Sequence, residues 1–321
     1  MDRQLETLVV TVPLKEAHIA RLRERYPDLN LIVDDDPTPD VLATADALVS
    51  WSIDETMLAA MPRLAWYQTG GAGVEGLPLA ALAARGIILT NNSGVHAINM
   101  SEHVLALMLA FARALPRLMR AQQARRWRDE ETRNSTFELH GQSLLLVGVG
   151  DIAIGVAERA AAFGMRISGV RRRSRLDPPA AIPTMVPLAR LHDALAEADH
   201  VVVSLPLTNR TRGLLGAAEI AAIKPGTFVY NVGRGAVIDQ AALIDALAAG
   251  RLGGAGLDVT DPEPLPADSP LWGMENVLIT AHTSGASPNY WDRGITIIEE
   301  NVARFRAGES LINEVDLDAG Y

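Results

Sequence analysis

Three residues in the last third of the chain have side chains that suit proton transfer and the stabilisation of negative charge. Arg234, Glu263 and His282 each come shortly after an apolar run that predicts a β-strand. In an open parallel sheet the carboxyl ends of the strands face the ligand crevice, so we expect the three side chains to share one cleft. The alternative interpretation is a set of surface ion pairs, which these residue types commonly form.

A glycine-rich turn earlier in the chain predicts a dinucleotide site. It reads G-V-G-D-I-A from Gly148 and stands between an apolar run and a helical pattern. Gly148 permits a tight turn, Gly150 lets the backbone approach a pyrophosphate, and Ala153 is small enough for close contact between helix and strand. The start of the helix, at Asp151 and Ile152, offers unpaired N–H groups to phosphates. The alternative is a structural turn without a ligand, which the negative charge of Asp151 favours.

Basic residues at the end of the next predicted strand indicate which dinucleotide is preferred. An NAD site carries an acidic residue about 20 residues after the turn, where it binds the ribose hydroxyls. The chain instead has Arg171, Arg172 and Arg173 at this point. Because guanidinium groups bind a 2′-phosphate through charged hydrogen bonds, we expect NADPH to be preferred over NADH. A solvated basic loop on an NAD-preferring protein is the other interpretation.

Short β-branched runs alternate with amphipathic runs over most of the chain, which is the pattern of βαβ units and a mainly parallel sheet. The first hundred residues predict strands at 7–12, 30–33, 47–51, 64–68 and 87–91. A long helix is expected to begin near Ser101, as its N-cap, and to restart at Pro116. Further strands are expected at 143–147, 166–170, 200–205, 227–231, 256–259 and 277–280, followed by a helix at 288–305. The fold class is therefore α/β, with two parallel-sheet units.

The composition limits the classes of function that remain. The chain has 321 residues, enough for about two domains, with no cysteine and a formal net charge of −10. An acidic chain repels phosphate backbones, so nucleic acid is not expected as a partner. The longest apolar stretch, residues 104–112, is too short to cross a membrane, and the first residues predict a strand rather than a signal peptide. The absence of cysteine fits a cytoplasmic protein, and no metal site is expected.

Five segments, in family order, make the sequence similar to the D-isomer-specific 2-hydroxyacid dehydrogenases. They are residues 148–153, 204–208 (S-L-P-L-T), 231–235 (N-V-G-R-G), 258–264 (D-V-T-D-P-E-P) and 282–285 (H-T-S-G). The arginine-tipped strand looks like the branch of NADPH-dependent glyoxylate/hydroxypyruvate reductases. Three positions depart from the family pattern: Ala153 replaces a glycine, Ala281 a proline and Asp261 a glutamate. The resemblance implies two doubly wound parallel-sheet domains, a Rossmann cofactor domain at residues 100–285 inserted into a flavodoxin-like substrate domain of residues 1–99 and 286–321.

The resemblance also implies a reaction, namely hydride transfer between NADPH and a small 2-oxo acid to give a D-2-hydroxy acid. In this scheme His282 is the acid/base, Glu263 orients it, and Arg234 binds the substrate carboxylate and polarises the carbonyl. Histidine suits this role because it titrates near neutrality. The remaining residues expected to bind the cofactor are Leu205, Pro206, Val232, Gly233 and Asp258.

The substrate is expected to meet a glycine loop and an aromatic side chain. Gly71, Ala72 and Gly73 follow a predicted strand and can present N–H groups to an anion, which the resemblance identifies as the substrate carboxylate. Trp51 is expected at the edge of the cleft, where it limits the size of the substrate side chain; an ordinary core position is equally compatible with its type. Family likeness suggests a homodimer. The alternative function is an NAD(P)-binding regulatory, corepressor-like protein without significant turnover.

Overall fold

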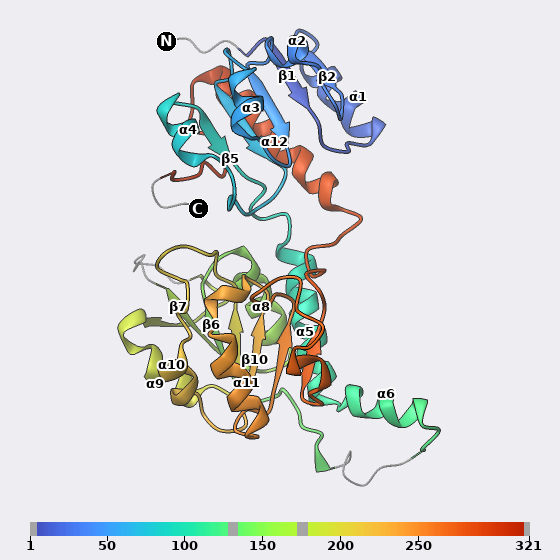
Figure 1. Cartoon of the computed structure of the whole chain (residues 1–321), viewed down its shortest axis with the longest axis vertical. Coiled ribbons are helices and arrows are strands. Elements are labelled where there is room, and N and C mark those ends of the chain that lie inside the picture. The colour runs from blue at the N-terminus through green and yellow to red at the C-terminus, as the bar shows by residue number, and fades with distance from the viewer. Residues whose placement is uncertain (1–4, 128–133, 172–178, 318–321) are drawn as a thin grey trace. The chain divides into compact units, whose positions relative to one another are not determined.

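The structure is a computed structural model that describes residues 5–127, 134–171 and 179–317. The chain divides into two compact units (Figure 1): Met1–Val95 with Ser287–Tyr321 form the first, and His96–Ala286 form the second. The second unit is thus an insertion between two parts of the first. All strand pairings within the two described sheets are parallel. The predicted α/β fold with two parallel-sheet units is confirmed.

A five-stranded sheet in the order β2-β1-β3-β4-β5 forms the centre of the first unit. Its strands are β1 (Thr7–Val10), β2 (Asn30–Val33), β3 (Ala47–Ser50), β4 (Trp66–Thr69) and β5 (Ile88–Thr90). Its helices are α1 (Glu16–Arg25), α2 (Pro39–Leu42), α3 (Glu55–Ala59), α4 (Leu79–Ala84) and α12 (Tyr290–Ala307). This strand order is that of flavodoxin-like sheets, as expected.

The helix α12 belongs to the first unit although the whole second unit separates it from β5 in the sequence. Its residues Trp291, Ile295 and Phe305 join the same buried cluster as Leu8 of β1 and Trp66 of β4. Full burial of a side chain of this size stabilises the fold by about 2 kcal/mol. The helix expected at residues 288–305 is therefore present and packs on the first unit.

A seven-stranded sheet in the order β12-β11-β10-β9-β6-β7-β8 forms the centre of the second unit. Its strands are β6 (Ser143–Val147), β7 (Arg166–Arg171), β8 (Thr184–Pro187), β9 (His200–Val203), β10 (Phe228–Asn231), β11 (Gly254–Leu257) and β12 (Val277–Ile279). Its α-helices are α5 (Ala97–Ala112), α6 (Leu115–Gln123), α8 (Asp151–Ala162), α9 (Leu191–Glu197), α10 (Ala217–Ala222) and α11 (Gln240–Ala248). The order reverses between β9 and β6, which is where a Rossmann sheet binds its dinucleotide. None of the described helices is long and apolar enough to cross a lipid bilayer.

The helix α5 begins earlier than the sequence predicts. Its N-cap is His96, not Ser101. The Ser101 hydroxyl donates to the Ile98 carbonyl at 2.8 Å, inside the helix. Because a serine can satisfy its hydroxyl in this way without ending a helix, its residue type alone does not locate the N-terminus. The expected restart is confirmed, since α6 begins at Leu115 with Pro116 in its first turn.

Candidate active site

The second unit brings the predicted proton-transfer residues to one edge of its sheet. Arg234 follows β10, Glu263 follows β11 and His282 follows β12. These three strands are neighbours and run parallel, so their carboxyl ends lie at the same edge. The sheet therefore places the three loops next to one another, as expected for a ligand crevice.

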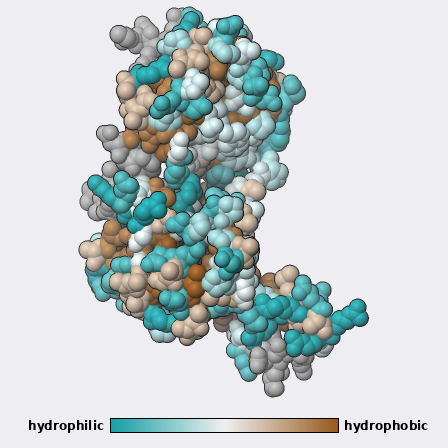
Figure 2. Space-filling view, viewed as in Figure 1, coloured by the Kyte–Doolittle hydropathy of each residue, from teal (hydrophilic) through white to brown (hydrophobic). Residues whose placement is uncertain are grey.

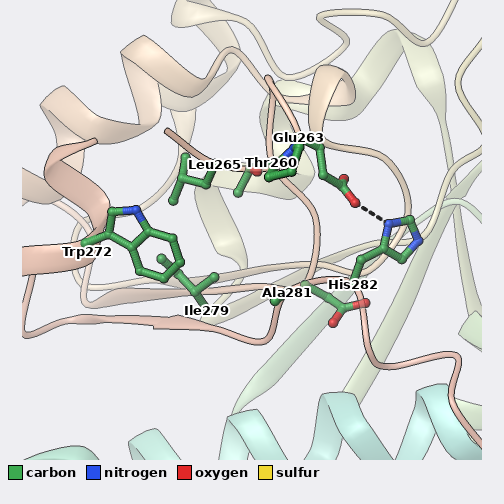
Figure 3. Close-up of a pocket in the computed structure, with 9 residues that line it drawn as sticks. Thr260, Glu263, Leu265, Trp272, Ile279, Ala281 and His282 are labelled. Carbon is green, nitrogen blue, oxygen red and sulfur yellow. Dashed lines mark hydrogen bonds and ion pairs between the residues drawn. The ribbon is translucent and has the colours of Figure 1, made fainter. Parts of the chain in front are cut away.

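Glu263 and His282 are joined directly. A hydrogen bond links Nδ1 of His282 to Oε1 of Glu263 (Figure 3). With Nδ1 engaged in this way, Nε2 is the nitrogen that remains to exchange a proton with another molecule. Both side chains stay accessible, with 49% and 39% of their surface exposed for His282 and Glu263. The arrangement is the one that general acid–base chemistry needs, an accessible imidazole oriented by a carboxylate.

Asp258 shapes the loop that presents the histidine. The backbone of this loop is left-handed, with φ of 46° at Ala281 and 56° at His282, a conformation that costs non-glycine residues about 1–2 kcal/mol each. The Asp258 carbonyl accepts the His282 N–H at 2.6 Å, and its carboxylate accepts the N–H groups of Thr283 at 2.9 Å and Ser284 at 3.1 Å. The carboxylate is thus engaged by the loop, and its contact with a cofactor stays a prediction.

The loop of Arg234 is shaped by Asn231 and packs on the loop that follows β11. The Asn231 side chain accepts the Gly233 N–H at 3.1 Å and donates to the Arg234 carbonyl at 3.0 Å. A Cβ atom on Gly235 would lie 1.9 Å from the carbonyl oxygen of Thr260. Because only glycine allows so close an approach, the segments after β10 and β11 are held in contact.

A cavity of about 300 Å³ lies beside the His282–Glu263 pair (Figure 3). Leu265, Trp272 and Ile279 form its apolar end, and the pair lies at the other end. The accessible pair thus opens onto a cavity whose far end is apolar.

The glycine-rich turn between β6 and α8 fits a dinucleotide. Gly148 has a φ of 99°, which favours glycine, and a Cβ there would lie 2.8 Å from Cδ2 of Leu205. A Cβ on Gly233 would lie 2.6 Å from the Leu205 carbonyl oxygen, so these three predicted residues meet at the sheet edge. Gly150 is the N-cap of α8, and a Cβ there would meet no atom within 4 Å. The backbone at the start of α8 is therefore open to a phosphate group.

The other predicted cofactor residues lie around this turn. Asp151 and Ile152 form the first turn of α8, and Pro206 and Val232 are the chain neighbours of Leu205 and Gly233. Arg171 is the last residue of β7, and the carbonyl of the residue before it accepts the N–H of Gly148 at 3.0 Å. The first of the three predicted arginines is thus next to the turn. Arg172 and Arg173 lie outside the described residues.

The predicted substrate residues of the first unit also come together. The loop of Gly71, Ala72 and Gly73 follows β4, and Trp51 follows the neighbouring strand β3. A Cβ on Gly70 would lie 2.8 Å from the Trp51 ring, so the indole packs on the start of this loop. Trp51 is 50% exposed, and its surface position leaves the indole accessible to a ligand.

An aromatic cluster supports Trp51 from the side of α12. The ring centroids of Tyr290 and Trp291 lie 5.9 Å and 5.4 Å from that of Trp51. Trp291 is 8% exposed and belongs to the core of the first unit. Burial raises the pKa of Tyr290, and its hydroxyl donates to the Gly70 carbonyl. The cluster therefore fixes both the indole and the start of the glycine loop.

The family of this chain follows from its agreement with known proteins. The NAD binding domain of the D-isomer specific 2-hydroxyacid dehydrogenases matches residues 105–284. The chain belongs to this family. The glyoxylate reductase of Korarchaeum cryptofilum is 32% identical over 321 residues, which cover 95% of each chain.

The chain is also similar to a longer dehydrogenase and to a dehydrogenase of solved structure. The D-3-phosphoglycerate dehydrogenase of Mycobacterium tuberculosis is 34% identical over 296 residues, 92% of this chain but 54% of that protein. The chain thus spans about half the length of this relative. A D-isomer specific 2-hydroxyacid dehydrogenase from Xanthobacter autotrophicus, solved in complex with NADPH and MES, is 30% identical. The match covers 99% of this chain and 100% of that chain with a TM-score of 0.82.

Several residues that shape the site of this dehydrogenase family member were not predicted. Asn231 is the last residue of β10, Thr280 directly follows β12, and Ser284 binds the Asp258 carboxylate. Asn91 and Asn92 follow β5 in the same way and contact the glycine loop. The signal that identifies most of them is a polar residue directly at the carboxyl end of a buried parallel strand, the position that faces a ligand crevice.

Proposed function

We propose that the protein reduces small 2-oxo acids to D-2-hydroxy acids with NADPH, as a glyoxylate/hydroxypyruvate-type reductase. The observation that carries the proposal is the hydrogen-bonded His282–Glu263 pair at the carboxyl edge of a Rossmann sheet, next to the loop of Arg234. Membership of the 2-hydroxyacid dehydrogenase family supports the type of reaction. The likeness to a glyoxylate reductase supports a small substrate.

His282 supplies the proton in this scheme. NADPH, when bound, supplies the hydride that adds to the carbonyl carbon of the substrate. The carbonyl oxygen gains the electron pair of the C=O π bond and takes a proton from Nε2 of His282, while Nδ1 keeps its hydrogen bond with Glu263. The Glu263 carboxylate balances the positive charge that the imidazole carries before the transfer.

Arg234 binds the substrate and stabilises the charge that develops on it. A guanidinium group can form two parallel hydrogen bonds with a carboxylate and also polarise a neighbouring carbonyl oxygen. The N–H groups of Gly71, Ala72 and Gly73 bind the substrate carboxylate. Trp51 limits the size of the substrate side chain, since its exposed indole packs on the start of this loop.

NADPH is held by the second unit. The residues that hold it are Gly148, Gly150, Asp151, Ile152, Leu205, Pro206, Val232, Gly233 and Asp258, with Arg171, Arg172 and Arg173 at the 2′-phosphate. The open backbone at Gly150 and the position of Arg171 beside the turn support this assignment. The relative from Xanthobacter autotrophicus was solved with NADPH, which supports the preference for this dinucleotide.

We also propose that the protein is a homodimer that forms through an arm made of residues 115–127. The arm contains α6, which extends away from the sheet of the second unit (Figure 1). Its apolar residues Leu115, Leu118, Met119 and Trp127 are exposed, Trp127 at 99%. Hydrophobic residues stand among hydrophilic ones on its surface in Figure 2. Apolar side chains gathered on so short a segment are typical of a surface that another chain covers.

The reaction is tested by mixing the purified protein with NADPH and a panel of glyoxylate, hydroxypyruvate and pyruvate, and following the absorbance of the reduced nicotinamide. We expect substrate-dependent oxidation of NADPH. His282→Ala should lower kcat/KM by about 10³-fold, because the proton donor is lost, and should leave NADPH binding unchanged. NADPH binding without oxidation by any acid of the panel would instead support the regulatory alternative.

The cofactor preference is tested with two matched charge reversals at opposite ends of β7. Arg171→Asp should lower kcat/KM for NADPH by about tenfold or more and leave that for NADH nearly unchanged, because the 2′-phosphate loses a charged partner. Arg166→Asp, at the amino end of the same strand, should change neither value. An equal NADPH preference in wild type and Arg171→Asp would refute the role of this arginine.

A further inference from the structure

Three consecutive carbonyl groups of the glycine loop after β4 are held by the two asparagines that follow β5. The Asn92 side-chain amide donates to the Gly70 carbonyl at 2.9 Å. The Asn92 backbone N–H donates to the Gly71 carbonyl at 2.9 Å. The Asn91 side-chain amide donates to the Ala72 carbonyl, also at 2.9 Å. All carbonyls of this stretch thus point toward the asparagines.

The direction of the carbonyl groups determines the direction of the N–H groups. In a trans peptide the N–H of one residue points opposite to the C=O of the residue before it, and the cis peptides of the described chain lie elsewhere. The N–H groups of Gly71, Ala72 and Gly73 therefore point away from the asparagines. The N–H of Gly71 donates to Oγ1 of Thr69 at 3.3 Å, so an anion would share this donor with the hydroxyl. Adjacent N–H groups with a common direction bind anions.

The asparagines are themselves fixed by a buried polar network. Oδ1 of Asn92 accepts from the Gln68 amide at 3.0 Å. Oε1 of Gln68 accepts from the Thr90 hydroxyl at 2.6 Å and from the Asn301 amide at 3.3 Å. Asn92, Gln68, Thr90 and Asn301 are all fully buried. Asn91 is held through its own oxygen, which accepts the Ser93 N–H at 3.0 Å.

We propose that Asn91 and Asn92 are positioning residues that aim the glycine loop at a carboxylate. They contact the loop through its carbonyl side, so they act through its backbone rather than on the substrate. The inference rests on the proposed function, because the anion is then the carboxylate of a 2-oxo acid. The preference for the acid over its ester then depends on this loop, since an ester offers no negative charge to the N–H groups.

Asn91→Ser is the variant that tests this role. A serine hydroxyl can still accept the Ser93 N–H in a turn of the same kind, but it is too short to reach the Ala72 carbonyl. We expect the KM for the 2-oxo acid to rise about tenfold, with kcat and the KM for NADPH nearly unchanged, because one fixed partner of the loop is lost. The ratio of kcat/KM for the acid to that for its methyl ester should fall by a similar factor.

The matched control is Asn30→Ser, the same chemical change on β2 of the same unit, where the amide contacts Thr7 and not the loop. It should leave the acid-to-ester ratio at the wild-type value. The ratio compares two substrates on the same active molecules, so a lower folded fraction does not alter it. An unchanged ratio in Asn91→Ser, which is what an equal loss for acid and ester gives, would overturn the positioning role.

A failure of the proposed function is recognised separately. If the wild type reduces no 2-oxo acid, the binding of oxamate, an unreactive analogue that carries the carboxylate, is measured by calorimetry. A wild-type protein that binds oxamate about tenfold more tightly than Asn91→Ser supports the positioning role without any turnover. Equal binding, or no binding to the wild type, overturns it.

Discussion

His103 of α5 reaches the loop that presents His282. Its Nε2 lies 3.0 Å from Oγ1 of Thr280, and this hydroxyl donates to the Asp258 carboxylate at 2.6 Å. Because the hydroxyl has one proton, which it gives to Asp258, it accepts from the Nε2–H of His103. His103 thus donates to Thr280, which in turn donates to the Asp258 carboxylate that holds the His282 loop.

Loss of this donor should slow the reaction without weakening the cofactor site. We expect His103→Ala to lower kcat by about tenfold with little change in the KM for NADPH, because the His282 loop becomes less well fixed. His103→Gln, whose amide can donate to Thr280, should recover most of the rate. Steady-state kinetics of both variants check this, and equal rates for the alanine and glutamine variants would contradict it.

His200, at the start of β9, is a buried histidine with two hydrogen-bond partners. Burial lowers its pKa to about 4, so it is neutral in the folded protein near pH 7. The Tyr230 hydroxyl, whose own pKa is raised by burial, lies 3.1 Å from Nδ1, and the Gln142 side-chain oxygen lies 2.5 Å from Nε2. Tyr230 donates and Gln142 accepts, which assigns the proton of the ring to Nε2.

The buried histidine should make the second unit less stable in acid. An unfolded histidine binds a proton near pH 6.5, while the folded one does so only near pH 4, so protons favour the unfolded state between these values. We expect a loss of about 2 kcal/mol of unfolding free energy between pH 7 and pH 4.5 from this residue. Urea unfolding at the two pH values should show a smaller loss in His200→Phe. His140→Gln, at an exposed histidine, is the control, and an unchanged pH dependence in His200→Phe would contradict the prediction.

At the scale of elements, α5 and α8 are held in close contact by a glycine. A Cβ on Gly155 of α8 would lie 2.9 Å from the Ala97 carbonyl oxygen and 3.0 Å from the Ser101 hydroxyl oxygen. The first of these atoms belongs to the backbone of α5, so it cannot turn aside. Gly155 therefore sets how closely the two helices approach each other.

Gly155→Ala tests this contact because two effects have opposite signs. Helix propensity alone predicts that the alanine stabilises the protein by about 1 kcal/mol. We expect instead a loss of about 1–3 kcal/mol, because the added methyl group forces the helices apart. Thermal or urea unfolding decides between the gain and the loss. A more stable variant would show that α5 moves to accommodate the methyl group at little cost.

Most elements could be predicted from the sequence because parallel strands are nearly continuous apolar runs. The run from Leu144 to Val147 is fully apolar and forms β6 after its first residue. The edge strand β8 was missed, because its four residues are exposed or half-buried and include Thr184 and Pro187. A strand that pairs on one side and buries little apolar surface has no such signal.

The candidate site could be predicted only in part. Arg234, Glu263 and His282 were found from their types and their places after strands, and the structure joins two of them by a hydrogen bond. The proposed role of Asn91 and Asn92 depends on their hydrogen bonds to carbonyl groups of the glycine loop. These bonds join the ends of two neighbouring strands, so they depend on the register of the strands, which spacing in the sequence does not give.

At the scale of the whole molecule, the arm of residues 115–127 should decide the oligomeric state. Met119→Asp puts a charge on an exposed apolar residue of α6, where the proposed dimer would have to bury it without a partner. We expect the variant to be monomeric and the wild type dimeric, as measured by light scattering.

A second charged substitution serves as the control for the arm. Phe163→Asp changes an equally apolar, exposed residue at the end of α8 and should leave the dimer intact. A dimeric Met119→Asp protein would show that the subunit contact lies elsewhere. A monomeric wild type would show that the proposed dimer does not form.

The insertion of one unit into the other has a consequence for biosynthesis. On the ribosome, residues 96–286 emerge as one uninterrupted stretch and can fold as soon as they leave the exit tunnel. The strands β1 to β5 emerge before them but lack α12, whose Trp291, Ile295 and Phe305 complete their core. Until translation reaches that helix, these five strands expose an apolar sheet face, which is the kind of surface that chaperones bind.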